Sequence, residues 1–345
     1  MPRPKFTEWP VANLREDQVV RMYGAGFAGC IDDPEAEVRL RESVTAHGGF
    51  PDARDALAQY GLAGSYEGKL VTPFQSILRL YPGSLPGPGQ QRGDCVSHST
   101  KNACLLTMCC EVEGNRPDDE TGKIEEAPEV SPEGIKNGVL STGAIYWYRG
   151  YDSDGWSCQA AARVATEEAA AWVRKDYPEL GIDLTVYSGR LAGKYGRRSP
   201  PSEITRHGQK HLIRTATSIR SFDELRDLLG NGYGVSGCGG EGWSNRRDAN
   251  GFSTRSGSWS HAMAVIAADD RDEIKKEYGG PLICIQNSWG KFNSGSRRIL
   301  GTDIDIPEGS FWAKWSACKR RYHVAFSSLS GWPRRKLPDY KTGIL

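Results

Sequence analysis

The chain has 345 residues, 38% of them hydrophobic, and its 44 Lys and Arg balance 43 Asp and Glu to a net charge of +1. A chain this close to neutral has no overall field to steer it toward nucleic acid or an anionic membrane, so we expect neither as a partner. No run approaches the ~18 apolar residues of a spanning helix, and the N-terminus lacks the apolar core of a secretory signal. We therefore expect a cytoplasmic protein or a component of a larger assembly such as a virion, where neighbouring subunits would be its partners.

The cysteines follow no recognisable pattern. There are nine, an odd number, with no C-x-x-C pair and no regular spacing. This argues against a disulfide framework and against a zinc site. We expect most of them to be small buried hydrophobes in a reducing compartment, and we expect no metal and no cofactor.

Residues 1–80 are predicted to form a mostly helical N-terminal extension. The patterns indicate helices over 13–23, over 34–44 with Pro34 in the first turn, and over 53–60 with Gly61 as the stop. No residue pattern here indicates chemistry. The extension is therefore either structural or an inhibitory propeptide.

The next region, 81–211, is predicted to be a helical lobe built around Cys95. A loop rich in Pro and Gly, 82–89, leads to a helix from Cys95 to about Glu111, with Asp94 as its N-cap. Apolar residues surround most of this helix, which predicts that it is buried. Three further segments complete the region: an acidic surface insertion at 113–133, an Ala-rich helix at 158–175, and a basic loop at 191–211.

From residue 212 to 330 the chain is predicted to be rich in strands. A capping box of Ser221 and Glu224 opens one helix that ends near Gly230. Short apolar runs divided by glycine are typical of strands, and they occupy 233–236, 261–268, 282–286 and 309–315. A helical first half and a stranded second half indicate an α+β fold with two lobes, followed by a C-terminal tail at 331–345.

His261 and Asn287 lie at matching ends of two predicted strands. His261 opens one apolar run and Asn287 closes the next, with a polar connection at 269–280 between them. If the two strands pair antiparallel, the start of the first lies beside the end of the second. The Asn287 carbonyl could then orient the imidazole and leave its other nitrogen for a thiol.

Cys95 has the position of a nucleophile. At a helix N-terminus the unpaired N–H groups and the helix dipole favour a thiolate, and a nearby imidazolium lowers the thiol pKa further. The thiolate would attack a carbonyl, and His261 would then protonate the leaving amine. The Cys95 backbone N–H and a side-chain amide from the preceding loop would stabilise the oxyanion, with Gln90 as the first choice and Gln91 as the second.

Three motifs carry a resemblance to a known family. The first is the run from Gln90 to Cys95, which ends in Gly-Asp-Cys at the start of a predicted helix. The second, Ser260 to Val265 (Ser-His-Ala-Met-Ala-Val), opens a predicted strand, and the third, Gln286 to Gly290 (Gln-Asn-Ser-Trp-Gly), closes one. Together they resemble the papain-like cysteine peptidases. The segments Gly155 to Ala161 and Phe222 to Val235 are also similar to parts of that family, so the resemblance covers roughly residues 85–320.

The resemblance implies a set of roles. Cys95 would be the nucleophile, His261 the general acid/base and Asn287 its orienter. A glutamine would donate to the oxyanion, and Trp289 would shield the His–Asn pair. The implied fold is α+β, with a helical lobe, an antiparallel β-barrel-like lobe and the active site in the cleft between them.

Several features depart from the family's pattern, and two of them lie in the loop before the nucleophile. Asp94 puts a carboxylate beside the nucleophile, which would oppose a thiolate unless the side chain turns away into its capping role. Gln90 lies one step closer to Cys95 than the family's glutamine does.

Other titratable residues are weaker candidates for the same roles. His98 lies three residues beyond Cys95 on the same predicted helix, so it would point along the helix axis rather than across a cleft. Asp269 and Asp270 could orient His261 as in transglutaminase-like enzymes, but they lie at the far end of the predicted strand.

We therefore predict a papain-like cysteine endopeptidase that hydrolyses peptide or protein substrates through an acyl-enzyme on Cys95. One alternative is a non-catalytic structural or assembly protein, such as a virion component, that keeps the fold. Another is an amidase or acyltransferase, of cell-wall or transglutaminase-like type, with the same triad. Labelling of Cys95 by a thiol-reactive epoxide distinguishes the endopeptidase from the non-catalytic alternative. Cleavage of a peptide library distinguishes it from the amidase or acyltransferase.

Overall fold

The structure is a computed structural model that describes residues 29–31, 33–114, 140–150, 154–168, 172–196, 200–209, 213–318 and 322–326. The helices are α2 (Pro34–Ala46), α3 (Ala53–Gln59), α4 (Phe74–Leu80), α5 (Cys95–Gly114), α7 (Thr142–Tyr146), α8 (Cys158–Glu167), η2 (Pro178–Leu180), α9 (Gly189–Ala192), α10 (Ser202–Gly208), α11 (Phe222–Gly230), α12 (Asp272–Tyr278) and α13 (Trp315–Cys318). The strands are β1 (Leu70–Val71), β2 (Asp176–Tyr177), β3 (Ile182–Asp183), β4 (Ala216–Ile219), β5 (Gly234–Trp243), β6 (Arg255–Asp269), β7 (Leu282–Gln286), β8 (Ser310–Lys314) and β9 (Tyr322–Phe326).

One antiparallel sheet dominates the second half of the chain. Its order is β4-β9-β5-β6-β7-β8, with β1 also paired to β6, and β2 and β3 form a separate pair. The predicted strands at 233–236, 261–268, 282–286 and 309–315 are confirmed as parts of β5, β6, β7 and β8. Within the described residues the two ends of this order do not pair, so the expected closure into a barrel is not found.

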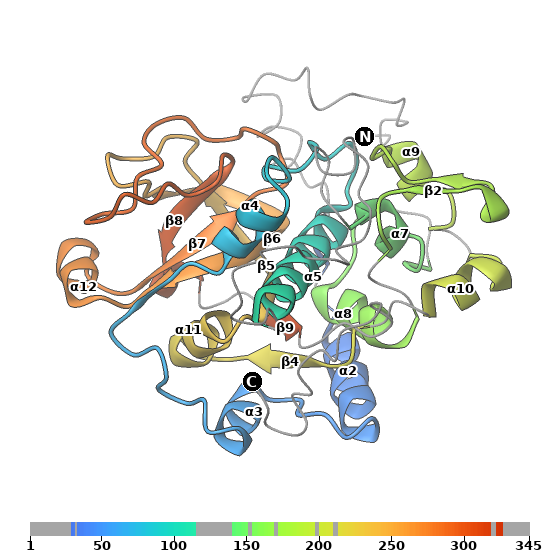
Figure 1. Ribbon diagram of the computed structural model, residues 1–345, viewed down its shortest axis with the longest axis horizontal. Coiled ribbons are helices and arrows are strands. Elements are labelled where there is room, and N and C mark those ends of the chain that lie inside the picture. Colours follow the sequence, from blue (N-terminus) through green and yellow to red (C-terminus); the bar gives the residue numbers. More distant parts are fainter. Residues whose placement is uncertain are drawn as a thin grey trace, which may run out of the picture.

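Helices cover both faces of this sheet, and α5 runs through the centre of the molecule between the sheet and the helices α7 to α10 (Figure 1). Neighbouring residues of β6 enter opposite cores: Ala264 and Ile266 pack with α4 and α5, while Met263 and Val265 pack with α3 and α11. A strand that is buried on both faces needs apolar residues throughout. This explains the uninterrupted apolar run after His261.

The central helix α5 is buried along most of its length, as predicted. Every residue from Cys95 to Cys109 is buried, including the polar side chains of His98 and Lys101. Its start is therefore held in place by packing on all sides. The helix continues to Gly114, so it enters the expected acidic insertion, and residues 115–139 of that insertion lie outside the described residues.

The described part of the N-terminal extension is built into the fold. Strand β1 pairs with the end of β6, and the backbone N–H groups of Gly64 and Gly68 donate to the carboxylates of Asp227 and Asp270. The predicted helices at 34–44 and 53–60 are confirmed as α2 and α3. The helix expected at 13–23 lies outside the described residues.

Two expectations for the helical region were wrong in part. Helix α8 ends at Glu167 rather than at residue 175, because Trp172 instead packs edge-to-face against Trp147 and Tyr177 in a separate aromatic core. The segment expected to be a basic loop contains α10, which begins at Ser202 after a proline. At the end of α8, tertiary packing of Trp172 outweighed the Ala-rich composition of the segment.

Cys158 and Cys238 form a disulfide that joins the start of α8 to β5. The expectation that the cysteines are unpaired is therefore wrong for these two residues. Their spacing of 80 residues gave no sequence signal, since only the fold brings a helix start and a strand together. The other seven cysteines form no disulfide.

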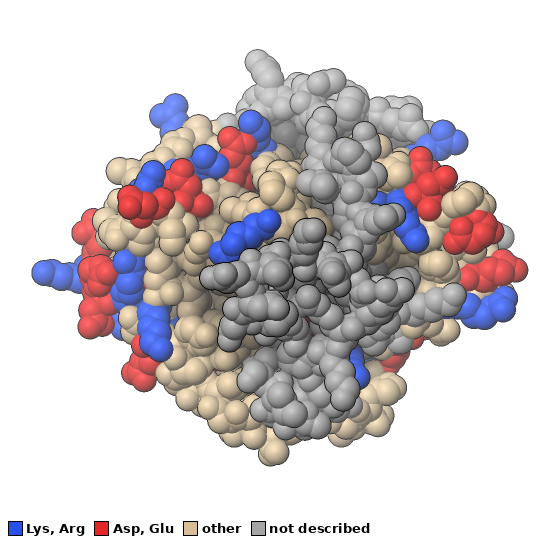
Figure 2. Space-filling model, viewed as in Figure 1, with Lys and Arg blue, Asp and Glu red and all other residues tan. Residues whose placement is uncertain are grey.

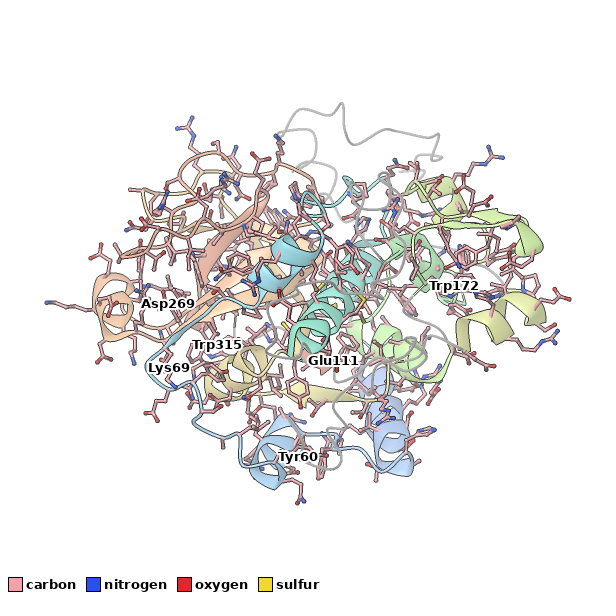
Figure 3. The ribbon with its side chains drawn as sticks, viewed as in Figure 1. Tyr60, Lys69, Glu111, Trp172, Asp269 and Trp315 are labelled. Carbon is pink, nitrogen blue, oxygen red and sulfur yellow. A yellow bond between two sulfur atoms is a disulfide. The ribbon has the colours of Figure 1, made fainter. Side chains whose placement is uncertain are left out.

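Charged side chains of both signs are interspersed around the visible face of the molecule (Figure 2). Figure 3 shows Trp172 on the helical side and Asp269 on the far side of the sheet, with Glu111 near the distal end of α5 between them. Within the described part of the chain no helix is both long and apolar enough to cross a membrane, and no group of three or more His, Cys, Asp or Glu side chains is arranged to hold a metal.

Candidate active site

Cys95 is the first residue of α5, and Asp94 occupies the predicted N-cap position. The backbone N–H of His98 donates to the Asp94 carbonyl at 3.1 Å, which is the first turn of the helix. The Asp94 carboxylate accepts from the Tyr187 hydroxyl at 2.7 Å. Burial raises the pKa of Asp94 to about 7, so near neutral pH its carboxyl is protonated in roughly half of the molecules and opposes a neighbouring thiolate less.

His261 and Asn287 are hydrogen-bonded neighbours. Strands β6 and β7 pair antiparallel, as expected, and this brings the Asn287 Oδ1 to 2.9 Å from the His261 Nε2. The backbone N–H of Ser288 donates to the same Oδ1 at 2.7 Å, so this amide atom is an acceptor. Because the group facing Nε2 is an acceptor, Nε2 must carry the proton, and Nδ1 is then the basic nitrogen of the neutral ring.

Aromatic side chains enclose this pair. Trp289 stacks on the His261 ring at 4.6 Å between centroids and an interplanar angle of 28°. Trp259 and Phe292 pack against Trp289 at 4.8 and 5.2 Å. An apolar wall of this kind excludes water and strengthens the His–Asn hydrogen bond.

The Cys95 sulfur lies next to the strand that carries His261. The backbone N–H of Ala262, the residue after His261, hydrogen-bonds the sulfur, and Cys95 and Ala262 belong to one buried cluster. Burial nevertheless raises the pKa of the Cys95 thiol well above its usual value, and the nearby Cys30 and Asp94 raise it further. The expected thiolate is therefore not favoured here, because desolvation outweighs the helix N-terminus.

A short stretch, Gly29–Ile31, which we call the crossing segment, contributes to this burial. It makes a parallel bridge with Trp156, in which the Ile31 N–H donates to the Trp156 carbonyl at 2.7 Å. On the other side the Cys30 N–H donates to the Ser260 carbonyl at 3.2 Å, and the Ser260 hydroxyl donates to the Cys30 carbonyl at 2.5 Å. The segment thus spans from the helical side to β6, directly over Cys95.

Gly29 allows this close approach. A Cβ added at Gly29 would lie 2.8 Å from the Cys95 sulfur and 2.8 Å from the Ser260 carbonyl oxygen. Contacts under about 3 Å are strongly repulsive, so only glycine fits between the nucleophile and the strand.

Gln90 and Gln91 point to opposite sides of the loop before Cys95. The Ser288 hydroxyl donates to the Gln90 Oε1 at 2.8 Å, and the Gln90 Nε2 donates to the Arg92 carbonyl at 2.5 Å. Gln91 instead accepts from the backbone N–H of Gly189 on the helical side. Of the two glutamines, Gln90 therefore lies beside Asn287 and Ser288.

The weaker candidates have partners of their own. The His98 Nε2 is 3.7 Å from the Asp94 carboxylate, its ring packs on Tyr187, and burial lowers its pKa well below its usual value. Asp269 pairs with Arg271 at the far end of β6, where β1 joins the sheet. The position of Asp269 agrees with the expectation from strand direction.

Sequence reasoning missed several residues of this site. Ser288 is adjacent to Asn287 in the motif, so its role could have been inferred. Tyr187 and the crossing segment come from distant parts of the chain and carried no signal of their own. Gly29 and Cys30 are unremarkable until the fold places them on Cys95.

No family model matches the chain, and no curated protein matches its sequence. Several solved structures of cysteine proteases are similar in fold. Xylellain from Xylella fastidiosa is 16% identical and covers 74% of this chain and 90% of its own, with a TM-score of 0.42. The proform of the ragweed pollen protease Amb a 11 is 13% identical and covers 91% and 76%, with a TM-score of 0.49. A digestive procathepsin L2 from Tenebrio molitor is 10% identical and covers 73% and 67%, with a TM-score of 0.37. Similarity at this level transfers no residue roles, so the case for the site rests on its own geometry.

Proposed function

We propose that the chain is a papain-like cysteine endopeptidase with Cys95, His261 and Asn287 as its triad. The observation that carries this proposal is the His261–Asn287 hydrogen bond under Trp289, beside a cysteine at the start of a buried helix. These are the parts that an activated thiol needs: a base, a group that orients the base, and a site that excludes water. The two-lobed arrangement with a cleft, and the division at residues 80, 211 and 330, belong to the same proposal.

The chemistry follows from the tautomer of His261. With Nε2–H held by Asn287, Nδ1 accepts the Cys95 proton, and the thiolate attacks the substrate carbonyl carbon. As the C–N bond of the tetrahedral intermediate breaks, the leaving nitrogen takes the proton from Nδ1 and departs as the amine. Water then hydrolyses the thioester with Nδ1 again as base.

Gln90 is the side-chain donor for the oxyanion in this proposal. Ser288 holds its Oε1, so the Nε2 side faces the loop of the nucleophile. To stabilise the tetrahedral intermediate, Nε2 would exchange the Arg92 carbonyl for the oxyanion, alongside the Cys95 backbone N–H. This exchange costs the hydrogen bond between Gln90 and the Arg92 carbonyl.

The crossing segment must leave before a substrate reaches Cys95. It occupies the backbone groups of Trp156 and Ser260 on either side of the sulfur. These groups could pair with an extended peptide by the same hydrogen bonds. In this proposal the N-terminal extension is thus inhibitory at residues 29–31 and structural from α2 onward.

A second candidate function is a non-catalytic role in an assembly. The complete burial of Cys95 and its raised pKa favour this alternative. Incubation of reduced protein with a peptide library, read by mass spectrometry, tests the choice. We expect cleaved peptides that are absent with Cys95→Ala. The endopeptidase would be excluded if neither the native protein nor a variant with a displaced crossing segment cleaved any peptide.

A further inference from the structure

The loop that leads into the nucleophile, residues 90–94, is tied down on both sides. On the sheet side, the Gln90 backbone N–H donates to the Ser288 carbonyl at 2.8 Å, and the Gln90 Oε1 accepts from the Ser288 hydroxyl. On the helical side, the Gln91 Oε1 accepts from the Gly189 backbone N–H at 2.7 Å. Residues far away in the sequence therefore set the position of this loop.

Tyr187 makes a further tie, which spans the loop. Its hydroxyl donates to the Asp94 Oδ2 at 2.7 Å and accepts from the Gln91 backbone N–H at 3.2 Å. A hydroxyl can do both at once because it carries one proton and two lone pairs. Tyr187 and Asp94 are both buried, so both hydrogen bonds are shielded from solvent. One oxygen atom thus joins the beginning of the loop to its end.

The second oxygen of the Asp94 carboxylate is held less closely. Its Oδ1 lies 3.7 Å from the His98 Nε2, which is beyond the length of a hydrogen bond. Within the described residues, Tyr187 is therefore the only side chain that hydrogen-bonds this carboxylate. The charged and titratable groups that face it are Tyr187, Arg92, Asp154, His98 and Cys95.

The two oxyanion donors of the proposed mechanism flank the residues that Tyr187 ties together. Gln90 directly precedes Gln91, and Cys95 directly follows Asp94. A loop displaced by about 1 Å would misplace both donors, and a shift of that size can cost about a hundredfold in rate. Because oxyanion donors act mainly on the transition state, such a shift lowers kcat more than it raises KM.

We propose that Tyr187 is a positioning residue for the cysteine chemistry: its hydroxyl holds the Asp94 carboxylate away from the Cys95 sulfur and fixes the loop that carries the oxyanion donors. The carboxylate is held from the helical side, whereas the sulfur accepts from the Ala262 backbone N–H on the sheet side. The hydrogen bonds are a property of the fold alone, but their effect on catalysis rests on the proposed function.

Tyr187→Phe removes the hydroxyl and keeps the ring, which packs on His98. The matched control is Tyr177→Phe, because the Tyr177 hydroxyl is also buried and donates at 3.0 Å to the Val173 carbonyl, in a separate aromatic core. We expect kcat for peptide cleavage to fall about tenfold to a hundredfold in Tyr187→Phe with little change in KM, and neither to change in Tyr177→Phe. If both variants cleave peptides with the same kcat, Tyr187 has no positioning role.

Urea unfolding across a pH series tests the tie without any need for activity. The Tyr187 hydrogen bond favours the charged form of Asp94 and so lowers the pKa of this carboxyl. Without the hydroxyl that pKa should be higher, so the fall in stability that accompanies ionisation of Asp94 should extend to higher pH in Tyr187→Phe. Tyr177→Phe should keep the native pH dependence, and Tyr187→Phe should cause no such shift when Asp94→Asn is also present.

The outcomes separate this inference from the proposed function. An unchanged pH dependence in Tyr187→Phe, or an equal shift in Tyr177→Phe, would overturn the tie between Tyr187 and Asp94. The expected shift in a protein that cleaves no peptide would confirm the tie and refute only the proposed function.

Discussion

Replacing Gly29 with alanine tests whether the crossing segment controls Cys95. The added Cβ would meet the Cys95 sulfur and the Ser260 carbonyl oxygen at 2.8 Å each; Cys95 is fully buried, and Ser260 is half-buried and held in β6. Overpacking of this kind costs about 1–3 kcal/mol, and about 1.4 kcal/mol changes a population ratio tenfold. We therefore expect Gly29→Ala to raise the uncovered population by about tenfold to a hundredfold.

Uncovering should also change the acidity of the thiol. Burial is the main cause of the raised pKa of Cys95, so exposure should lower that pKa and increase the thiolate fraction at neutral pH. Alkylation of Cys95 by iodoacetamide, followed by peptide mass spectrometry across a pH series, measures both the rate and its midpoint. We expect a faster rate and a lower midpoint in Gly29→Ala.

The matched control is Gly89→Ala, in the loop before the nucleophile. A Cβ there has no atom within 4 Å, so the substitution leaves the packing unchanged. If Gly29→Ala and Gly89→Ala alkylate at the same rate and with the same midpoint, the crossing segment does not set the reactivity of Cys95.

Three further predictions concern the triad, the buried carboxyl and the disulfide. Asn287→Ala should lower kcat/KM for peptide cleavage by about a hundredfold or more, because the His261 Nε2 loses its hydrogen-bond acceptor. The control Asn231→Ala, at the end of α11, should leave kcat/KM unchanged. Equal rates in the two variants would refute the orienting role of Asn287. Asp94 has a folded pKa raised to about 7 from 3.8, so the folded state binds the extra proton and stability falls as pH rises from about 4 to 7, by up to ~4 kcal/mol. Urea unfolding should show this fall in native protein and less of it in Asp94→Asn, and identical slopes would contradict the assignment. Cys158→Ser should lower the free energy of unfolding by up to about 4.5 kcal/mol, because the Cys158–Cys238 disulfide closes a loop of 80 residues. Urea unfolding measures this loss, and Cys238→Ser should show the same loss. An unchanged unfolding midpoint in both variants would show that the disulfide is not formed.

The strands and the His–Asn pair could be predicted because their signals are local. One apolar run after His261 marks β6 and another before Asn287 marks β7, and the proximity of the two polar residues follows from the antiparallel pairing of these strands. The burial of α5 could likewise be predicted from its composition. Each of these depends on neighbours in sequence or on one strand pair.

The remaining features depend on contacts between distant segments. Cys158 and Cys238 are 80 residues apart, and Tyr187 reaches Asp94 from a different part of the chain. The raised pKa of Cys95 is the clearest case. The sequence indicated a helix N-terminus that favours a thiolate, but the desolvation by Gly29–Ile31 could be found only from the fold.

Reaction of Cys95 with an epoxide probe that mimics an extended peptide tests the central claim most directly. Intact-mass and peptide mass spectrometry would be applied to reduced native protein, to Gly29→Ala and to Cys95→Ala. We predict one probe per molecule, attached at Cys95, faster in Gly29→Ala and absent in Cys95→Ala. If the folded native protein and Gly29→Ala both stay unmodified at Cys95, while the unfolded chain reacts there, Cys95 is not a catalytic nucleophile.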